Sequence, residues 1–270
     1  MASGDFSQAI ARLVGSSARW LIALDFDGTL APIVERPEDA RLEPQLAPLL
    51  TRLQEVAGSV AVISGRPRAF LETQLPPGVV IVGSYGLELP SDLSHRGKPE
   101  RFDATAAKAR LLAAQEELEP RLPAGSRLEA KPFGLVLHYR GAGAGFNEAA
   151  ASSLVSELAA RHGLEMVAGR LVLELKPQDT VDKGWALALL AARLEASAVV
   201  FVGDDLGDVP AWEATHQLGQ RVPALAVGIA SSELPADALD QCDLVLTDRS
   251  LLAPFLEGLI EAAGPGTGPG

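Results

Sequence analysis

Short apolar runs alternate with helical stretches at both ends of this 270-residue chain, and this alternation restricts the fold more than any other feature. Such runs fit buried strands, and the stretches between them have the spacing of covering helices. Strands are predicted at Leu21–Leu24, Ser59–Ile63, Val79–Val82, Ala198–Val202 and Ala224–Val227. Helices are predicted at Leu46–Val56, Pro67–Gln74, Lys183–Leu194 and Asp208–Thr215. The pattern predicts an α/β fold with a doubly wound, mostly parallel sheet covered on both faces.

The middle of the chain has a different pattern, in which helices alternate with hairpins. Helices are predicted at Ala104–Leu118 and Asn147–Arg161. Strands are predicted at Arg127–Lys131, Leu135–Arg140, Glu165–Ala168 and Leu171–Leu175. We therefore expect an α+β domain at residues 100–180, inserted into an α/β core at 1–99 and 181–263, and a flexible Gly/Pro tail at 264–270.

The composition narrows the class of protein. The chain has 35 acidic and 23 basic side chains, and a net charge of −12 disfavours nucleic acid, whose phosphates need clustered Lys and Arg. No apolar stretch approaches the roughly 18 residues of a membrane span. The N-terminus lacks a leader pattern, and the single cysteine, Cys242, fits a reducing compartment. We expect a cytoplasmic monomer that acts on a small molecule, without nucleic acid or a membrane as partner.

Carboxylates follow two of the predicted strands directly. Asp25 and Asp27 come after the first strand, and the two-residue period puts both on one side of the chain. Asp204, Asp205 and Asp208 come after a later strand. Any one of these could be only a turn residue or a helix cap. If the two strands are neighbours, the carboxylates converge and need a hard cation, for which oxygen ligands favour Mg²⁺.

Two shorter segments carry further polar groups. Ser64 and Arg66 follow the second predicted strand, where a hydroxyl and backbone N–H groups can bind an oxyanion; a plain helix cap is the alternative for Ser64. Lys183 opens a predicted helix, where a cation opposes the helix dipole. We therefore expect Lys183 to serve something other than its helix, the alternative being a solvated lysine.

In chain order these four segments resemble the haloacid dehalogenase-like phosphatase superfamily, through Asp-x-Asp-Gly-Thr, Ser-Gly-Arg, Lys-Gly and Gly-Asp-Asp-x-x-Asp. The resemblance implies a Rossmann-like core with a cap domain and phosphate ester hydrolysis through an aspartyl-phosphate. It implies Asp25 as the nucleophile and Asp27 as the general acid and then base. It further implies that Ser64 and Lys183 hold phosphate oxygens and that Thr29 hydrogen-bonds near the nucleophile.

The same resemblance implies a Mg²⁺ ion between the carboxylates and the phosphate. Asp25, Asp204 and the backbone carbonyl of Asp27 are the implied direct ligands. Asp205 is implied to join the metal site beside them, and both it and Asp208 are implied to act next to the direct ligands or through water.

The inserted domain narrows the resemblance. Mixed charges recur at 129–131 (Glu-Ala-Lys), 138–140 (His-Tyr-Arg) and 174–176 (Glu-Leu-Lys), which suits sugar hydroxyls; a solvated sheet face with ion pairs is the alternative. Together with Gly-Leu-Glu at 86–88, these segments resemble the trehalose-6-phosphate phosphatases. The implied substrate-binding side chains are Arg66, Glu88, Glu129, Lys131, His138, Arg140, Glu174 and Lys176.

The resemblance therefore implies an enzyme, a Mg²⁺-dependent phosphoric monoester hydrolase acting on trehalose 6-phosphate. The nearest alternative is another sugar phosphatase of the superfamily, for sucrose phosphate, mannosylglycerate phosphate or a hexose phosphate. A phosphomutase would need a means to exclude water, which the sequence does not show. A phospho-acceptor signalling domain has no need of a second aspartate to protonate a sugar. A non-catalytic sugar-phosphate sensor has no need of the complete set of catalytic residues, which are Asp25, Asp27, Ser64, Lys183 and Asp204.

Overall fold

The computed structural model describes residues 5–14, 19–34, 36–91, 93, 103–122, 124–142, 146–169, 171–178, 181–231, 234 and 236–264. The chain divides into two compact units, which we call unit 1 (residues 1–97 and 181–270) and unit 2 (residues 98–180). Apart from Gly264, the predicted flexible tail at 264–270 lies outside the described residues.

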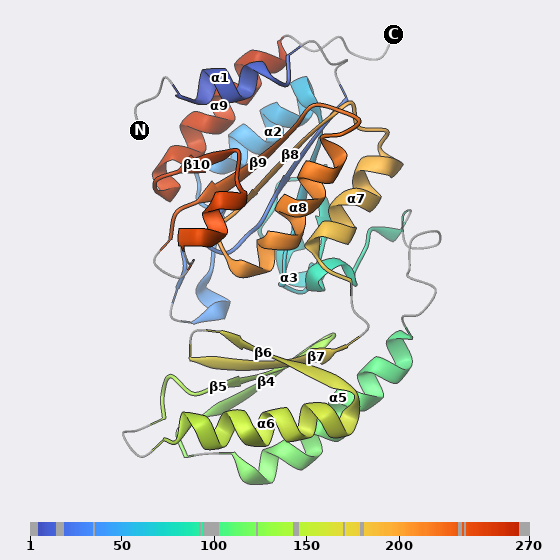
Figure 1. Cartoon of the computed structure of the whole chain (residues 1–270), viewed down its shortest axis with the longest axis vertical. Helices are drawn as coiled ribbons and strands as arrows, with labels where there is room; N and C mark the ends of the chain where they lie inside the picture. The colour runs from blue at the N-terminus through green and yellow to red at the C-terminus, as the bar shows by residue number, and fades with distance from the viewer. Residues whose placement is uncertain are drawn as a thin grey trace. The chain divides into compact units, whose positions relative to one another are not determined.

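Six described strands of unit 1 form one sheet in the order β10-β9-β8-β1-β2-β3 (Figure 1). Their bounds are β1 Trp20–Leu24, β2 Gly58–Ile63, β3 Val80–Val82, β8 Ala198–Gly203, β9 Ala224–Ile229 and β10 Leu244–Leu246. Every neighbouring pair in this sheet is parallel. From β1 the chain winds outward to β3, and from β8 it winds the other way to β10. The point where the winding reverses lies between β1 and β8, where open α/β sheets bind their ligands at the carboxyl ends of the strands.

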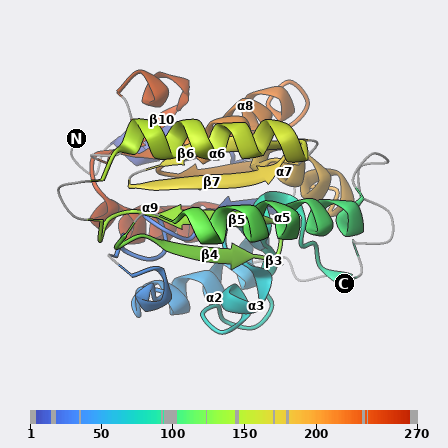
Figure 2. The same cartoon turned by 90° about the horizontal axis from the view of Figure 1, so that it is seen from below.

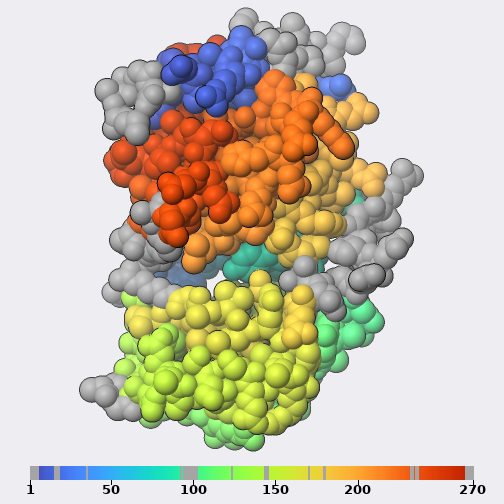
Figure 3. Space-filling model, in the orientation of Figure 1, coloured from blue at the N-terminus to red at the C-terminus, as the bar shows by residue number. Residues whose placement is uncertain are grey.

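Helices cover both faces of this sheet, which explains why the buried parts of its strands are apolar. The bounds are α1 Asp5–Ala11, α2 Leu46–Ala57, α3 Arg68–Glu72, α7 Lys183–Arg193, α8 Val209–Leu218 and α9 Leu252–Ala263. In β1, Ile22 packs into a core with α1, α2 and α9, whereas Leu21 packs into a second core with α7 and α8. Side chains of α7 and α8 cover the latter face in the space-filling view (Figure 3).

Unit 2 is an antiparallel sheet in the order β4-β5-β7-β6 with two helices on one face (Figure 2). The bounds are α5 Ala104–Leu118, β4 Arg127–Lys131, β5 Gly134–His138, α6 Glu148–His162, β6 Leu164–Gly169 and β7 Val172–Pro177. Leu135, Leu137, Leu173 and Leu175 face α5 and α6 and form the core of this unit. The observed architecture confirms the predicted fold class, a parallel α/β core with an inserted α+β unit.

Short 3₁₀ segments complete the described elements. They are η1 Pro37–Asp39, η2 Ser84–Gly86, η3 Glu119–Arg121, η4 Leu206–Asp208, η5 Ala236–Gln241 and η6 Arg249–Leu251. Asp208 therefore lies in η4, before the helix that was predicted to begin with it. The Asp208 carboxylate accepts backbone N–H groups of the preceding turn. Asp208 is therefore part of that turn, and the regular helix begins after it. Among the described residues no helix is long and apolar enough to cross a membrane.

Candidate active site

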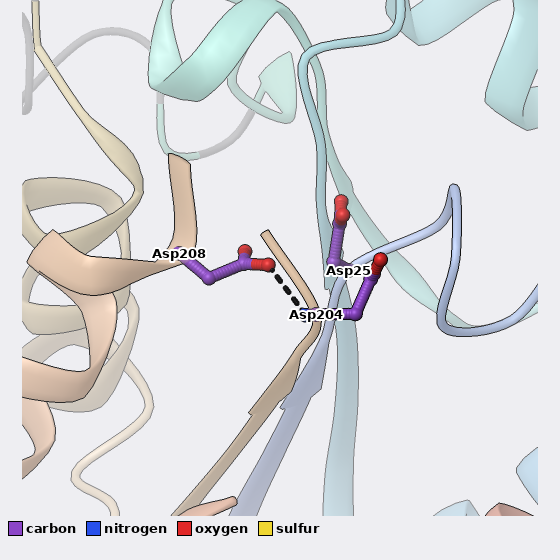
Figure 4. A group of neighbouring side chains, drawn as sticks. All are labelled: Asp25, Asp204 and Asp208. Carbon is purple, nitrogen blue, oxygen red and sulfur yellow. Dashed lines mark hydrogen bonds between the residues drawn. The ribbon is translucent and has the colours of Figure 1, made fainter. Parts of the chain in front are cut away.

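Asp25 and Asp204 lie side by side at the carboxyl ends of β1 and β8 (Figure 4). The register pairs Leu24 with Val202, and the Asp25 backbone N–H donates to the Val202 carbonyl at 2.9 Å. Both aspartates therefore sit one residue beyond the ends of adjacent strands. Each is only 2% exposed, so the winding of the sheet buries two carboxylates at one point.

Lys183 is the cation of this cluster. It is the first residue of α7, and its Nζ lies 2.9 Å from Asp25 Oδ1 and 2.7 Å from Asp208 Oδ1. The side chain is 2% exposed. A buried ammonium with two carboxylate neighbours explains why a cation occupies the first turn of a helix, against the helix dipole.

Asp208 organises the turn that follows β8. Its Oδ2 accepts the backbone N–H of Asp204 at 2.8 Å and that of Asp205 at 3.1 Å, while its Oδ1 accepts from Lys183. Both oxygens are thus occupied by protein donors. Asp208 fixes the backbone that carries Asp204 and the ammonium that contacts Asp25.

The turn after β1 holds Asp204 from the other side. Thr29, which is fully buried, donates its hydroxyl to Asp204 Oδ1 at 2.9 Å. Gly28 has φ +77°, and a Cβ built on it would stand 1.9 Å from Asp204 Oδ2. This position therefore requires glycine for its backbone conformation and for the close approach of the carboxylate.

Burial and crowding set the electrostatics of the cluster. Burial raises the pKa of Asp25 to about 7 despite the attraction of Lys183. Burial, with the charges of Asp208 and Asp205, raises the pKa of Asp204 to about 8. Burial disfavours the Lys183 ammonium, but Asp208 and Asp25 outweigh it and hold the pKa of Lys183 well above its usual value. The cluster therefore holds more carboxyl groups than its one lysine could offset if all of them were ionised.

The donor set fits a cation. One carboxylate oxygen each from Asp25, Asp204 and Asp208 lie within 4.8 Å of one another. Asp25 Oδ1, although 2.9 Å from the Lys183 ammonium, accepts no hydrogen bond from a described residue. Because the oxygens of Asp208 are taken, Asp25 and Asp204 are the carboxylates left for an ion. Carboxylate oxygens without sulfur or imidazole favour a hard divalent ion.

Four predicted residues of unit 1 lie around this cluster rather than in it. Ser64 follows β2, is 2% exposed, and its Oγ accepts the Arg66 backbone N–H at 3.3 Å. The Asp27 side chain is directed to the guanidinium of Arg66, with two contacts of 2.6 Å. Glu88 Oε2 accepts from the Ser84 hydroxyl at 2.6 Å and from the Arg68 backbone N–H at 3.0 Å.

Asp205, predicted to join the metal ligands, is exposed, and its carboxylate is not among the three that converge. It lies next to Asp204 in the chain, and its charge contributes to the raised pKa of Asp25 and Asp204. A contact with a metal ion through water, the alternative that the sequence left open for Asp205, stays a prediction.

In unit 2 the strand register puts five predicted residues on the sheet face opposite α5 and α6. They are Glu129, Lys131, His138, Glu174 and Lys176. His138 Nε2 lies 2.7 Å from Glu129 Oε2, and this hydrogen bond lowers the pKa of Glu129. Lys131 Nζ lies 3.2 Å from Glu174 Oε1. Arg140 lies beyond the end of β5 and is exposed.

A sequence model of the family described as trehalose-phosphatase matches residues 23–238, which includes the aspartate cluster and all of unit 2. The chain belongs to this family. The trehalose-phosphate phosphatase of Mycobacterium bovis (strain BCG / Pasteur 1173P2) is 37% identical over 222 residues, covering 77% of this chain and 55% of that protein. The one from Mycobacterium marinum is 34% identical, covering 80% and 56%.

An uncharacterized glycosyl hydrolase of Mycobacterium tuberculosis (strain ATCC 25618 / H37Rv) is 37% identical over 209 residues, covering 73% of this chain and 15% of that protein. The chain therefore spans about half the length of the trehalose-phosphate phosphatases it matches, and far less of this hydrolase. The family assignment confirms the resemblance seen in the sequence motifs.

Solved structures show the same fold. The C-terminal domain of Candida albicans trehalose-6-phosphate phosphatase superposes with a TM-score of 0.72 at 22% identity, covering 98% of this chain and 97% of that chain. A haloacid dehalogenase-like hydrolase from Bacteroides thetaiotaomicron superposes with a TM-score of 0.60 at 17% identity, covering 90% and 97%. The predicted haloacid dehalogenase-like architecture is thereby confirmed.

In this member of the trehalose-phosphatase family, two contacts of the site go beyond what the sequence motifs predict. Asp208 was expected beside the metal ligands, but its central contact with Lys183 joins residues 25 positions apart. The signal for it was present as the last carboxylate of Gly-Asp-Asp-x-x-Asp. The pairing of Arg66 with Asp27 joins residues 39 positions apart, and no sequence signal indicated it.

Proposed function

We propose that this chain hydrolyses trehalose 6-phosphate to trehalose and inorganic phosphate, with Mg²⁺ as its cofactor. The observation that carries the proposal is the buried cluster of Asp25, Asp204, Asp208 and Lys183 at the reversal point of the sheet. Membership of the trehalose-phosphatase family supports the substrate. Carboxylates beside a buried ammonium suit a phosphate dianion only when a metal offsets their charge.

In the first step Asp25 is the nucleophile. A bond forms between an Asp25 carboxylate oxygen and phosphorus while the bond from phosphorus to the sugar oxygen breaks. Asp27 gives its proton to that leaving oxygen, which makes the sugar a neutral alcohol. The product of this step is an aspartyl-phosphate on Asp25 and free trehalose.

In the second step water attacks the same phosphorus. Asp27 takes a proton from the water as the new bond forms, and the bond from phosphorus to the Asp25 oxygen breaks. Asp25 is thereby regenerated as a carboxylate and inorganic phosphate leaves. Acid–base assistance of this kind contributes roughly 10²–10⁴-fold to a rate.

The charge on phosphate is held by groups that are already fixed. Lys183 is placed by its two carboxylate neighbours, and Ser64 supplies a hydroxyl at the end of β2. Asp25, Asp204 and the Asp27 carbonyl would hold Mg²⁺, with Asp205 acting through water. When bound, Mg²⁺ neutralises charge on the phosphoryl oxygens. The close approach of a nucleophile to a dianion then becomes possible.

Recognition of the sugar is assigned to the polar face of the unit 2 sheet. Glu129, Lys131 and Glu174 are proposed as contacts to the glucose units, with His138, Arg140 and Lys176 as further candidates and Glu88 from unit 1. Support comes from the shared face and from the ion pair of Lys131 with Glu174, which holds both side chains in place. Charged groups left unpaired by a wrong sugar would lower its affinity.

A panel of sugar phosphates tests the proposal. Phosphate release is measured from trehalose 6-phosphate, sucrose 6-phosphate, mannosylglycerate phosphate and glucose 6-phosphate, with Mg²⁺ and with EDTA. The expected result is highest kcat/KM for trehalose 6-phosphate and loss of release in EDTA that added Mg²⁺ restores. Higher kcat/KM for another sugar phosphate would replace the substrate assignment, and phosphorylated isomer instead of free phosphate would indicate a mutase.

Glu174→Gln separates sugar recognition from chemistry. We expect KM for trehalose 6-phosphate to rise about 10-fold or more, since one well-placed polar contact to a substrate is worth this much or more. Turnover of p-nitrophenyl phosphate, which has no glucose units, is expected to stay unchanged. Glu157→Gln, at an exposed position of α6, is the matched control. An equal effect on both substrates would contradict the assignment.

A further inference from the structure

The guanidinium of Arg66 is committed to one carboxylate. Its Nε donates to Asp27 Oδ2 and its Nη2 to Asp27 Oδ1, each at 2.6 Å. Its Nη1 donates to the carbonyl of Pro37 at 2.7 Å. All three nitrogens therefore have acceptors, in the fork geometry that matches a carboxylate with two parallel hydrogen bonds.

Arg66 itself is held from several sides. Its guanidinium carbon lies 4.7 Å from the ring centre of Phe70, a cation–π arrangement. Phe70 meets Phe26 edge to face at 5.8 Å, and Phe26 is fully buried between Asp25 and Asp27 in the chain. The Arg66 side chain is 16% exposed, against 36% for Asp27. The contacts thus run from the core at Phe26 through Phe70 and Arg66 to Asp27.

We propose that Arg66 is a positioning residue that fixes the orientation of the Asp27 carboxylate, rather than a ligand of the phosphate. This inference rests on the proposed function, in which Asp27 transfers protons to and from the reacting oxygens. A short side chain that is one-third exposed can rotate, and a misaimed acid–base group loses much of its effect. A fork bound to both oxygens fixes the plane of the carboxylate as well as its place.

A role as phosphate ligand fits the geometry less well. Binding phosphate would require Arg66 to release Asp27, or to use the guanidinium edge away from it, while the Pro37 carbonyl already accepts from Nη1. The backbone of Arg66 is also fixed, since its carbonyl accepts the Ser84 N–H at 2.9 Å. The observed contacts therefore assign Arg66 to Asp27.

Two substrates distinguish positioning from phosphate binding. Arg66→Lys keeps the charge but loses the fork. With trehalose 6-phosphate, whose leaving oxygen needs a proton, kcat is expected to fall about 10–100-fold with little change in KM. With p-nitrophenyl phosphate, whose leaving group needs none, the first-turnover burst of p-nitrophenol is expected to keep its rate. Arg249→Lys, which breaks a comparable fork to Glu43, is the control and should leave both rates unchanged.

A double-mutant comparison tests whether Arg66 acts through Asp27. In Asp27→Asn the turnover of trehalose 6-phosphate is expected to fall further than in Arg66→Lys. Adding Arg66→Lys to Asp27→Asn is expected to change the residual turnover by less than about twofold, because the group that Arg66 positions is already lost. Multiplied losses in the double variant would overturn the proposal.

Three other results of these experiments would each reject the proposed role of Arg66 or the proposed function. A raised KM for both substrates in Arg66→Lys would identify a phosphate ligand and overturn the proposal. An equal fall of both rates with a lowered unfolding temperature would show a purely structural role and also overturn it. If the wild-type chain releases no phosphate from either substrate, the proposed function itself is wrong. If only the role of Arg66 is wrong, the wild-type chain still releases phosphate. The two failures can therefore be told apart.

Discussion

Lys183 carries its charge at a place where water does not reach it. Transfer of an ammonium into the interior costs several kcal/mol unless close partners compensate, and here Asp25 and Asp208 lie 2.9 and 2.7 Å away. The same lysine offsets part of the repulsion between the buried carboxylates. Each of these side chains is therefore tolerable only because the others are present, which makes the cluster sensitive to loss of any single member.

Removal of the cation tests this dependence. Lys183→Met is expected to lower the free energy of unfolding by about 3–5 kcal/mol in EDTA at neutral pH, since it leaves two buried carboxylates without their partner. Urea unfolding measures the change. Lys176→Met, which removes a partly exposed pair with Glu165, is the control and should cost under about 1 kcal/mol. Equal losses in the two variants would contradict a buried, mutually dependent cluster.

The ends of the parallel strands are the elements that the sequence predicted best. Asp25 and Asp204 follow uninterrupted apolar runs, and strand-end carboxylates of neighbouring strands must meet, so their convergence follows from fold class and chain order. The pairing of Asp27 with Arg66 depends on side-chain conformations that no local pattern encodes. For β10 no strand was predicted, because three residues carry no periodic signal. No helix was predicted for α9 either, although its buried residues have helical spacing: Leu252, Phe255, Leu256, Leu259 and Ile260.

The turn after β1 offers a test at the level of the element. Gly28→Ala is expected to lower the free energy of unfolding by more than about 2 kcal/mol and to abolish most turnover, because a Cβ would displace the Asp204 carboxylate. Gly264→Ala is the matched control, with φ +74° and open space around it. It should cost only about 1 kcal/mol and leave turnover intact. The difference between the two variants in free energy of unfolding separates the clash with Asp204 from the strain of a positive φ. Equal losses in both variants would show that the clash with Asp204 does not matter.

The two units divide the chemistry of the chain, in our proposal, between a buried anionic cluster and a polar sheet face. All three tryptophans, Trp20, Trp185 and Trp212, belong to unit 1, so tryptophan fluorescence follows the unfolding of that unit alone. With a net charge of −12, the proposed metal ion and Lys183 would have to supply the attraction for the proposed anionic substrate. Because unit 1 holds the buried carboxylates, its free energy of unfolding should depend on both pH and a bound metal ion.

The direction of the pH dependence follows from the raised pKa values. Folded Asp25 and Asp204 retain protons up to about pH 7 and 8, whereas the unfolded chain releases them near its ordinary carboxyl pKa. The folded state then binds more protons, so in EDTA the stability of unit 1 should fall as pH rises from about 5 to about 8. Mg²⁺ should oppose the fall, most strongly at the upper end. Unfolding followed by tryptophan fluorescence measures the effect of pH and the effect of Mg²⁺. A free energy of unfolding that rises across this pH range in EDTA would contradict the raised pKa values of the two buried carboxyls.

We propose that Asp25 takes the phosphoryl group beside a divalent ion, and trapping the chain during turnover would reveal the phosphorylated aspartate. Wild-type chain is mixed with trehalose 6-phosphate labelled in phosphorus, quenched in acid, and digested to locate the label. We expect label on the peptide that contains Asp25 when Mg²⁺ is present, and none in EDTA or in Asp25→Asn. Label that persists in Asp25→Asn, or undiminished labelling and phosphate release in EDTA, would contradict it.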